Sequence, residues 1–134
     1  MKRASAIAAS VIVAALAAGI AFGSSSAAKV TVTEKEWGFA PVPKTAKAGK
    51  ITFVAKNIGH LSHEFVVLKT RTPATKLKLH GAKAVETGLV ARIPTFKPGQ
   101  ARTLTLTLKP GHYVLICNLP AHYQAGQRVD FTVK

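Results

Sequence analysis

Cysteine, methionine and acidic residues are all scarce in this chain of 134 residues, and each shortage excludes something. Cys117 is the one cysteine, so no disulfide can form within the chain. The one methionine is Met1, so no thioether side chain is available beyond the first residue. Five Asp and Glu residues leave little scope for paired-carboxylate catalysis, and no glycine-rich phosphate loop is present. These gaps argue against two-carboxylate hydrolases and against nucleotide-binding enzymes.

Positive charge is abundant by contrast, because 19 Lys and Arg residues give a net charge of +14. Such a balance favours anionic partners, which include acidic proteins, anionic membrane surfaces and nucleic acids. The basic residues are scattered singly, as at Lys44, Lys47 and Lys50, and no aromatic platform is interleaved with them. We therefore expect no nucleic-acid partner. A protein partner with an acidic docking surface, weak association with an anionic membrane, and a merely solvated surface all stay open.

Residues 1–28 have the pattern of an export leader. Two basic residues precede an apolar run over Ala6–Phe22, and Ser26 and Ala28 suit the small-residue sites of a signal peptidase. The run is about 17 residues long, at the short edge of what spans a bilayer, so cleavage after Ala28 is favoured over an uncleaved membrane anchor. We expect a signal peptide followed by one mature domain, residues 29–134, that is secreted or exported to the periplasm.

Short runs with period-two alternation predict β-strands through the rest of the chain. Val30 and Val32 begin the first strand, which extends to Lys35 or Glu36, and Thr103–Leu108 alternates most strictly. Gly, Pro and Asn punctuate the runs at short intervals, which predicts an all-β Greek-key sandwich or barrel of about eight strands. The other predicted strands cover Lys50–Lys56, His63–Leu68, Tyr113–Cys117 and Gln127–Val133.

Two segments have less usual patterns. Residues 71–90 contain Pro73, Gly81 and Gly88, and we expect a short helix there or a long crossover between the two sheets. In the predicted strand Tyr113–Cys117 both faces are apolar, whereas one face of a surface strand is polar. This strand is therefore expected to be covered on both sides.

The most informative stretch runs from Cys117 to Gln127. Cys117 ends an apolar strand, His122 follows after four residues, and Gln127 follows after four more at the start of the last strand. A loop between two strands can turn these side chains toward one point, and His63, at the start of another strand, can reach the same end of the sandwich. A thiolate with two imidazoles and one weak axial ligand, which is Met, Gln or a backbone oxygen, is the donor set of electron-transfer copper sites. We therefore predict one copper ion held by His63, Cys117 and His122, with Gln127 as the axial ligand.

At these residues the sequence resembles the cupredoxins, the family of plastocyanin, azurin and pseudoazurin. One similar stretch is Asn57-Ile58-Gly59 followed by His63-Glu64-Phe65-Val66, and the other is Tyr113 through Gln127. The resemblance implies an eight-strand Greek-key sandwich, a type 1 (blue) copper, and outer-sphere transfer of single electrons through the exposed edge of His122. Gln127 departs from the family pattern, in which most members carry Met, and is similar to the stellacyanin-like branch.

The three strong ligands each have a plainer alternative. Cys117 could be a small buried apolar residue, or could pair with a second copy of the chain. His63 and His122 could lie at the surface, and His60 is a local rival of His63. The spacing of Cys117 and His122 favours ligation over these alternatives.

The remaining polar residues near the predicted site also have plainer alternatives. Gln127 could face solvent, and Gln124 is its local rival. Asn57 and Asn118 are candidates for tying the two ligand loops together, although Asn is more common as a simple turn residue. No other potential metal ligand lies near His80 or His112 in the sequence, and we expect both histidines at the surface.

Three functions are compatible with this pattern. The first is an exported one-electron carrier, a monomer that meets redox protein partners and catalyses no reaction on a substrate. The second is a copper chaperone or storage protein, which the shortage of Cys and Met disfavours because Cu(I) sites favour several soft ligands. The third is a metal-free interaction module, since a fold does not fix a function. A cysteine nucleophile with a histidine base would leave His63 unexplained.

Overall fold

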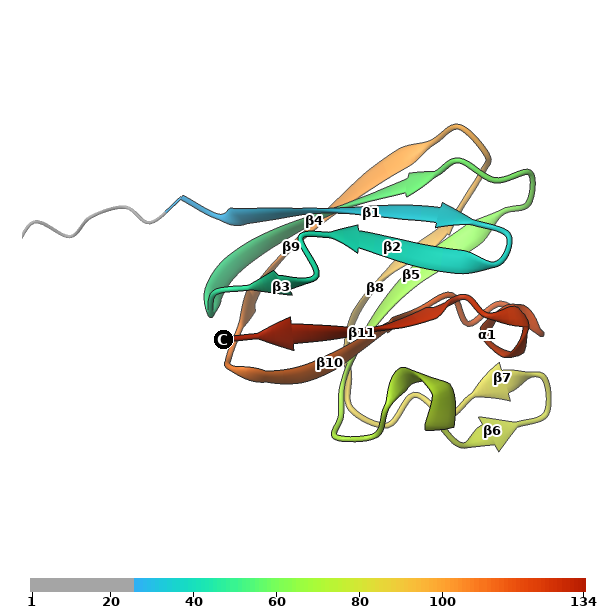
Figure 1. The fold of residues 1–134 in the computed structure, drawn as a ribbon. Coiled ribbons are helices and arrows are strands. Elements are labelled where there is room, and N and C mark those ends of the chain that lie inside the picture. Colours follow the sequence, from blue (N-terminus) through green and yellow to red (C-terminus); the bar gives the residue numbers. More distant parts are fainter. Residues whose placement is uncertain (1–25) are drawn as a thin grey trace, which may run out of the picture.

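The computed structural model describes residues 26–134, which form a sandwich of two β-sheets (Figure 1). A short 3-10 turn, η1 (Ala74–Lys76), and one short helix, α1 (His122–Ala125), interrupt the strands. No helix in this described part is long and apolar enough to cross a membrane. The predicted signal peptide lies almost wholly outside the described residues and stays a prediction. The strands are β1 (Ala28–Lys35), β2 (Gly38–Val42), β3 (Thr45–Ala46), β4 (Gly49–Asn57), β5 (His63–Lys69), β6 (Leu79–His80), β7 (Lys83–Ala84), β8 (Leu89–Phe96), β9 (Ala101–Leu108), β10 (Gly111–Ile116) and β11 (Arg128–Val133).

The two layers of the sandwich contain four and five strands. One sheet has the order β2-β1-β4-β9, the other has the order β3-β11-β10-β5-β8, and β6 and β7 form a separate small hairpin. Strands pair antiparallel except for β1 with β4 and β3 with β11, which are parallel. β3, β6 and β7 have two residues each, and the other strands have five or more. The predicted all-β sandwich of about eight strands is therefore confirmed.

The main core lies between the sheets and follows the period-two alternation of the strands. In β1, Val30 and Val32 point inward and are fully buried. Phe53 of β4 packs against Phe65 and Phe131 of the other sheet, each at a ring-centroid distance of 5.4 Å. Burying one such side chain contributes about 1.5–3 kcal/mol, so this aromatic cluster holds the two layers together.

A second apolar cluster covers the outer face of β5 and β10, as the apolar pattern of Tyr113–Cys117 predicts. Val66, Leu68, Val114 and Ile116 are buried there beneath residues of η1, β7 and α1. The segment between β5 and β8 supplies most of this cover. Because both faces of β5 and β10 are packed, the ends of these two central strands are rigid supports for the loops that follow.

The segment 71–90 does not cross between the sheets. β5 and β8 flank it and pair antiparallel within one sheet, so the expected crossover is wrong, while the expected short helix is present as η1. The sequence pattern does not predict β8, which contains Pro94. The structure places β8 at the edge of its sheet, where a residue without a backbone N–H is tolerated.

Candidate metal centre

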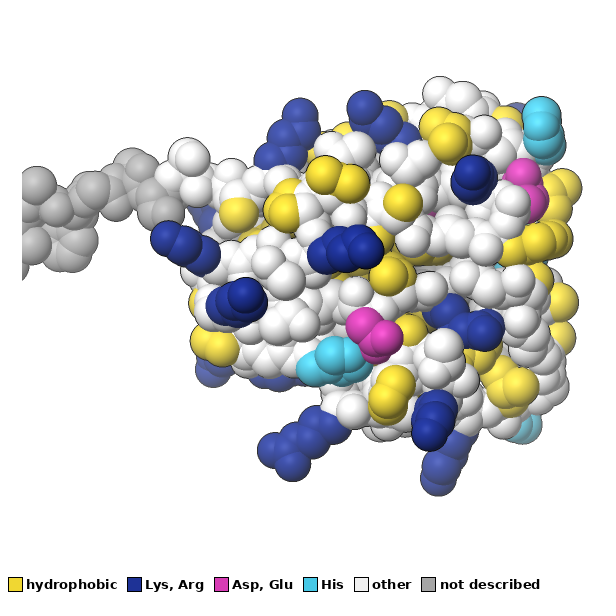
Figure 2. Space-filling view, viewed as in Figure 1, with side chains coloured by type: hydrophobic (Ala, Val, Ile, Leu, Met, Phe, Trp, Pro, Cys, Tyr) yellow, Lys and Arg dark blue, Asp and Glu magenta, His cyan; other side chains and the backbone are white. Residues whose placement is uncertain are grey.

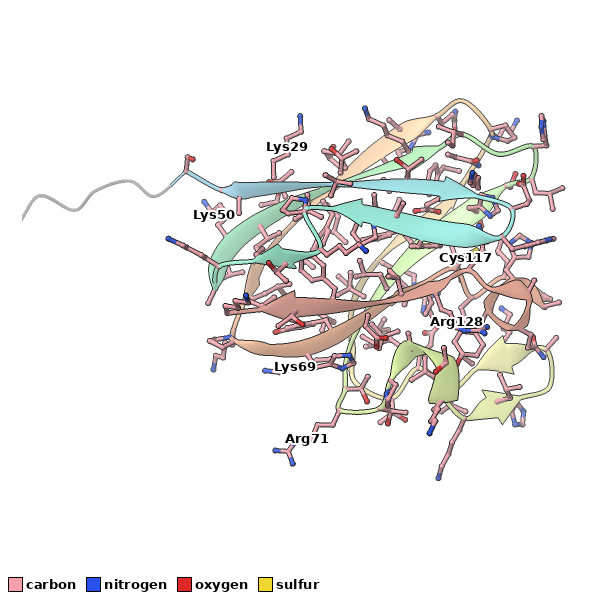
Figure 3. The ribbon with its side chains drawn as sticks, viewed as in Figure 1. Lys29, Lys50, Lys69, Arg71, Cys117 and Arg128 are labelled. Atoms are coloured by element: carbon pink, nitrogen blue, oxygen red, sulfur yellow. The ribbon has the colours of Figure 1, made fainter. Side chains whose placement is uncertain are left out.

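One end of the sandwich brings the four predicted ligands together. His63 is the first residue of β5, and Cys117 directly follows β10, the antiparallel neighbour of β5. His122 opens α1 and Gln127 directly precedes β11. The loop is closed by two backbone bonds of 3.1 Å, in which Cys117 N–H donates to the Gln127 carbonyl and Gln127 N–H to the His122 carbonyl. Figure 3 shows Cys117 at this end, close to α1.

The potential ligand atoms face one another at short range. His122 Nδ1 lies 3.3 Å from His63 Nδ1, 3.4 Å from Cys117 Sγ and 2.9 Å from Gln127 Oε1. The ligand atoms of His63, Cys117 and His122 all lie within 4.8 Å of one another. His63, Cys117 and Gln127 are fully buried, whereas His122 is half-buried. The structure thus gathers all four residues that the sequence analysis selects, and their role as ligands is proposed below.

A carboxylate holds the far side of His63. Glu36 Oε1 lies 3.0 Å from His63 Nε2, and the same carboxylate accepts N–H bonds from His60 at 3.0 Å and Leu61 at 2.8 Å. The bonds from the His60 and Leu61 backbone, assisted by His63, lower the pKa of Glu36 to about 2. Burial lowers the pKa of His63 and favours its neutral form. Because ionised Glu36 accepts the Nε2 proton, the lone pair of His63 lies on Nδ1, the nitrogen that faces the other donors.

Cys117 is enclosed in a setting that suits a sulfur ligand. The backbone N–H of Glu64 donates to Sγ at 3.3 Å, which is the bond that a ligating thiolate commonly accepts. Burial raises the pKa of the Cys117 thiol to about 11. Without a metal the thiol is therefore protonated and unreactive, which argues against a cysteine nucleophile.

The side-chain amide of Gln127 is oriented by the chain opposite. Its Nε2 donates to the Lys35 carbonyl at 3.0 Å, so its oxygen is the end that lies 2.9 Å from His122 Nδ1. Gln127 can therefore offer an oxygen to the same centre. Its rival Gln124 is exposed on α1.

The ligand loops are tied to neighbouring segments, and less directly to each other. Asn57 Nδ2 donates to the Phe96 carbonyl at 3.3 Å. Asn118 exchanges two bonds with the backbone of Ala84, at 2.8 and 2.9 Å. The expected link between the two loops is made by Glu64, whose Oε1 accepts the Asn118 backbone N–H at 3.1 Å.

A buried acid lies close to this end of the core. Glu34 takes the inward position of β1 after Val32, whereas the sequence pattern predicts Lys35 or Glu36 as the next alternating residue. Glu34 is fully buried, and neither carboxylate oxygen has a hydrogen-bond partner among the described residues. Burial, with a contribution from the charge of Glu64, raises the pKa of Glu34 to about 9. The acid is therefore uncharged at neutral pH.

His122 is the part of the site nearest to solvent. Trp37 packs edge-on against its ring, with the ring centroids 5.3 Å apart and the planes at 82°. The side chains of Trp37, Ile58 and Leu61 are 49%, 60% and 45% exposed, and we call these three residues the apolar rim. Figure 2 shows hydrophobic side chains gathered along this edge of the molecule.

The other histidines lie outside the group of four. His60 is exposed and contributes its backbone N–H to Glu36. His80 is exposed in β6, as expected. His112 is only half-buried rather than fully at the surface, with Nδ1 at 2.6 Å from the Thr70 carbonyl and Nε2 at 2.8 Å from Asp130.

Three residues that support the site are missed by sequence reasoning: Glu36, Trp37 and Glu64. Glu64 has a local signal, because it is a charged residue within the apolar run of β5. Glu36 and Trp37 lie at the turn between β1 and β2, far from His63 along the chain. No local pattern reports a contact of that kind.

Comparison with known proteins defines the class of fold. Neither a protein-family profile nor a curated protein sequence matches the chain. Among solved structures, auracyanin from Roseiflexus castenholzii superposes with a TM-score of 0.62 at 24% identity, covering 81% of this chain and 98% of that one. Auracyanin A from Chloroflexus aurantiacus, a "blue" copper protein, gives 0.58 at 20%, with 79% and 98% covered. Rusticyanin from Thiobacillus ferrooxidans gives 0.56 at 18%, with 79% and 76% covered. The fold is thus a cupredoxin-type β-sandwich.

The donor set at the site fits a copper ion. Two imidazole nitrogens and one sulfur, joined by an amide oxygen, match the two-histidine, one-cysteine arrangement with a weak axial ligand. Neighbouring donor atoms 3.3 to 3.4 Å apart can each lie roughly 2 Å from a common point. The residues His63, Cys117, His122 and Gln127 could therefore hold a copper ion.

Proposed function

We propose that this protein is an exported type 1 (blue) copper protein that carries single electrons between redox partners. One observation carries the proposal: the ligand atoms of His63, Cys117 and His122 lie within 4.8 Å of one another at one end of a cupredoxin-type sandwich. Gln127 is the proposed axial ligand. When bound, copper supplies a Cu(II)/Cu(I) couple that accepts or releases one electron.

The role of the protein is to hold the donor atoms in one arrangement. Glu36 fixes His63 from behind, the Lys35 carbonyl fixes the Gln127 amide, and the Glu64 N–H lies against the Cys117 sulfur. Donors that are each restrained by a second contact keep their geometry when the charge at the site changes. Such restraint favours electron transfer, because little structural rearrangement accompanies it.

The site is suited to contact with another protein rather than to a substrate. Three of its four residues are fully buried, and His122 alone reaches toward the surface. Two surface hollows, one beside Leu77 and Val85 and the other beside Lys69 and His112, contain none of the four. We therefore do not propose catalysis.

The redox partner is proposed to dock on the apolar rim around His122. An apolar centre with a polar surround is the usual anatomy of such contacts. Lys97 and Arg102 are exposed beside the β8–β9 turn, which hydrogen bonds to Asn57 at this same end. These positive charges favour a partner with an acidic docking surface and a monomeric carrier.

Voltammetry of the copper-loaded protein tests this function against copper handling. A carrier gives a reversible one-electron wave and keeps its copper in the presence of a Cu(I) chelator. Rapid loss of copper to the chelator, with no reversible wave, would favour a chaperone or store. Protein isolated from its native compartment without copper would favour a metal-free interaction module.

A further inference from the structure

Eight basic side chains lie at the end of the sandwich opposite the candidate metal centre. Every one of them is exposed. We call this set the basic pole. Figure 3 labels four of its members, all on the side away from Cys117, and Figure 2 shows Lys and Arg side chains around this end. The members are Lys29, Lys44, Lys47, Lys50, Lys69, Arg71, Lys109 and Lys134.

Strand register places these residues together although they come from distant parts of the sequence. Lys134 N–H donates to the Ala46 carbonyl at 2.9 Å, and Ala48 N–H donates to the Lys134 carbonyl at 2.7 Å. Lys50 is the register partner of Thr107, two residues before Lys109. Lys69 is the partner of Tyr113, near the start of β10, so the β5 end and the β9–β10 turn share this pole.

Four of the five acidic residues lie away from the basic pole. Glu36 contacts His63, Glu64 follows His63, and Glu86 hydrogen bonds to Asn118, so these acids belong to the metal end. Glu34, which pairs with Asn57, also lies there and is buried. Asp130 is the fifth acid and lies beside the pole, because its Oδ1 is 2.8 Å from His112 Nε2, while His112 Nδ1 is 2.6 Å from the carbonyl of Thr70, between Lys69 and Arg71. With eight basic residues and one acid beside them, the pole carries a strong positive charge.

Because the basic pole and the metal centre lie at opposite ends, an anionic surface and a redox partner would bind at different places. The six residues of β10 between the pole and Cys117 span about 20 Å, which exceeds the Debye length of about 8 Å at physiological salt. An anionic surface attracted to the pole would therefore lie far from His122. A redox partner docked on the basic pole would be too far from His122 for rapid electron exchange. The pole therefore suits a binding partner that does not need to reach the metal centre.

A membrane surface is such a binding partner, and two features of the chain favour it. β1 begins at Ala28 and enters the sandwich at this same end, where the C-terminus also lies (Figure 1). The sequence before β1 contains the apolar run Ala6–Phe22, a membrane-directed segment in either of its two interpretations. We propose that the basic pole binds anionic phospholipid headgroups and that this contact turns the metal end toward the aqueous phase. The inference does not depend on the metal.

Binding to vesicles tests the proposal directly. The chain from Lys29 onward suffices, because the strand partners and both buried clusters of the described protein lie within it, apart from Ala28 at the edge. We expect it to bind phosphatidylcholine vesicles only when phosphatidylglycerol is included, and to be released by salt. Equal binding to pure phosphatidylcholine would overturn the proposal.

Two matched sets of substitutions locate the contact. Each Lys near an anionic surface strengthens binding about fivefold, so K44Q/K47Q/K50Q/K109Q, which removes four of them, should weaken it about 600-fold. The control K56Q/K83Q/K97Q/R102Q removes the same charge from exposed positions outside the pole and should have at least tenfold less effect. Equal losses would show that net charge alone drives binding. Should the first set fail to fold, K69Q/K134Q replaces it.

The one tryptophan of the sequence reports the orientation. Trp37 lies at the metal end and is 49% exposed. If the pole faces the lipid, the emission of Trp37 keeps its wavelength on vesicle binding and stays open to quenching by acrylamide. A blue shift with loss of quenching would place the metal end in the membrane and contradict the proposal. Equally tight binding to soluble polyglutamate would assign the pole to an acidic protein instead.

Discussion

Glu36 and His63 form a carboxylate–imidazole pair in which Oε1 and Nε2 lie 3.0 Å apart. Because this bond sets which ring nitrogen carries the proton, it prepares Nδ1 of His63 as a ligand. Glu36→Gln removes the charge but keeps an oxygen for the His60 and Leu61 N–H groups. We expect the affinity for Cu(II) to fall about 10- to 100-fold and the reduction potential to rise, as measured by competition titration and voltammetry.

Asp130→Asn is the control for this substitution. Asp130 pairs with His112 Nε2 at 2.8 Å, so the change removes the same charge from the same kind of pair, away from the site. Copper affinity in this variant should match the wild type. An unchanged affinity in Glu36→Gln, or an equal loss in both variants, would contradict a positioning role for Glu36.

Gln127 tests the proposed axial position. A thioether is a softer donor than an amide oxygen and favours Cu(I), so Gln127→Met should raise the reduction potential. Each rise of about 59 mV corresponds to a tenfold change in relative affinity for the two oxidation states. Gln124→Met, at the exposed rival position on α1, should leave the potential unchanged. If both variants behave alike, Gln127 is not an axial ligand.

Trp37 tests the proposed docking surface. Its ring packs on His122 while half of it faces solvent, so Trp37→Ala removes contact area where a partner would meet the site. We expect the electron self-exchange rate, measured by NMR line broadening at high salt, to fall about fivefold with an unchanged optical spectrum. Val42→Ala, at an apolar side chain that is 70% exposed on β2, is the control and should not slow exchange. A Trp37→Ala rate equal to that of wild type would move the contact elsewhere.

Glu34 makes the stability of the metal-free protein depend on pH. Its pKa is about 9 in the folded state against 4.5 as the ordinary value, so between these limits the folded state binds a proton that the unfolded state has released. The contribution of Glu34 to stability is therefore greatest below pH 4.5 and is lost as the pH rises toward 9, on the order of 1 kcal/mol per pH unit.

Glu34→Gln removes the titrating group, so folding no longer takes up a proton at this position. Urea unfolding of both proteins across this range should show the variant gaining stability relative to wild type as the pH rises. The comparison isolates Glu34, because the other titrating groups are common to both proteins. Parallel pH profiles would mean that Glu34 is ionised in the folded state, with a partner that the described contacts do not include.

The sequence predicted the candidate ligands better than their supports. Cys117, His122 and Gln127 share one loop, so their spacing can be recognised in the sequence. His63 could be added because it was predicted to begin a strand. Glu36 reaches His63 because the turn after β1 folds over the start of β5, and only the packed structure brings the two together. β8 was not predicted because Pro94 is unfavourable within a strand, although an edge strand tolerates it. The burial of Glu34 was not predicted because an acid is not expected at an inward position of an alternating strand.

The spectrum of the Cu(II)-loaded protein tests the central claim most directly. If His63, Cys117 and His122 hold one copper, the wild type should show an intense sulfur-to-copper visible band with a matching spin-resonance signal. Cys117→Ala, which replaces a fully buried side chain at no change in charge, should fold and lose that band. A colourless wild type, or a band of equal strength in Cys117→Ala, would contradict the account.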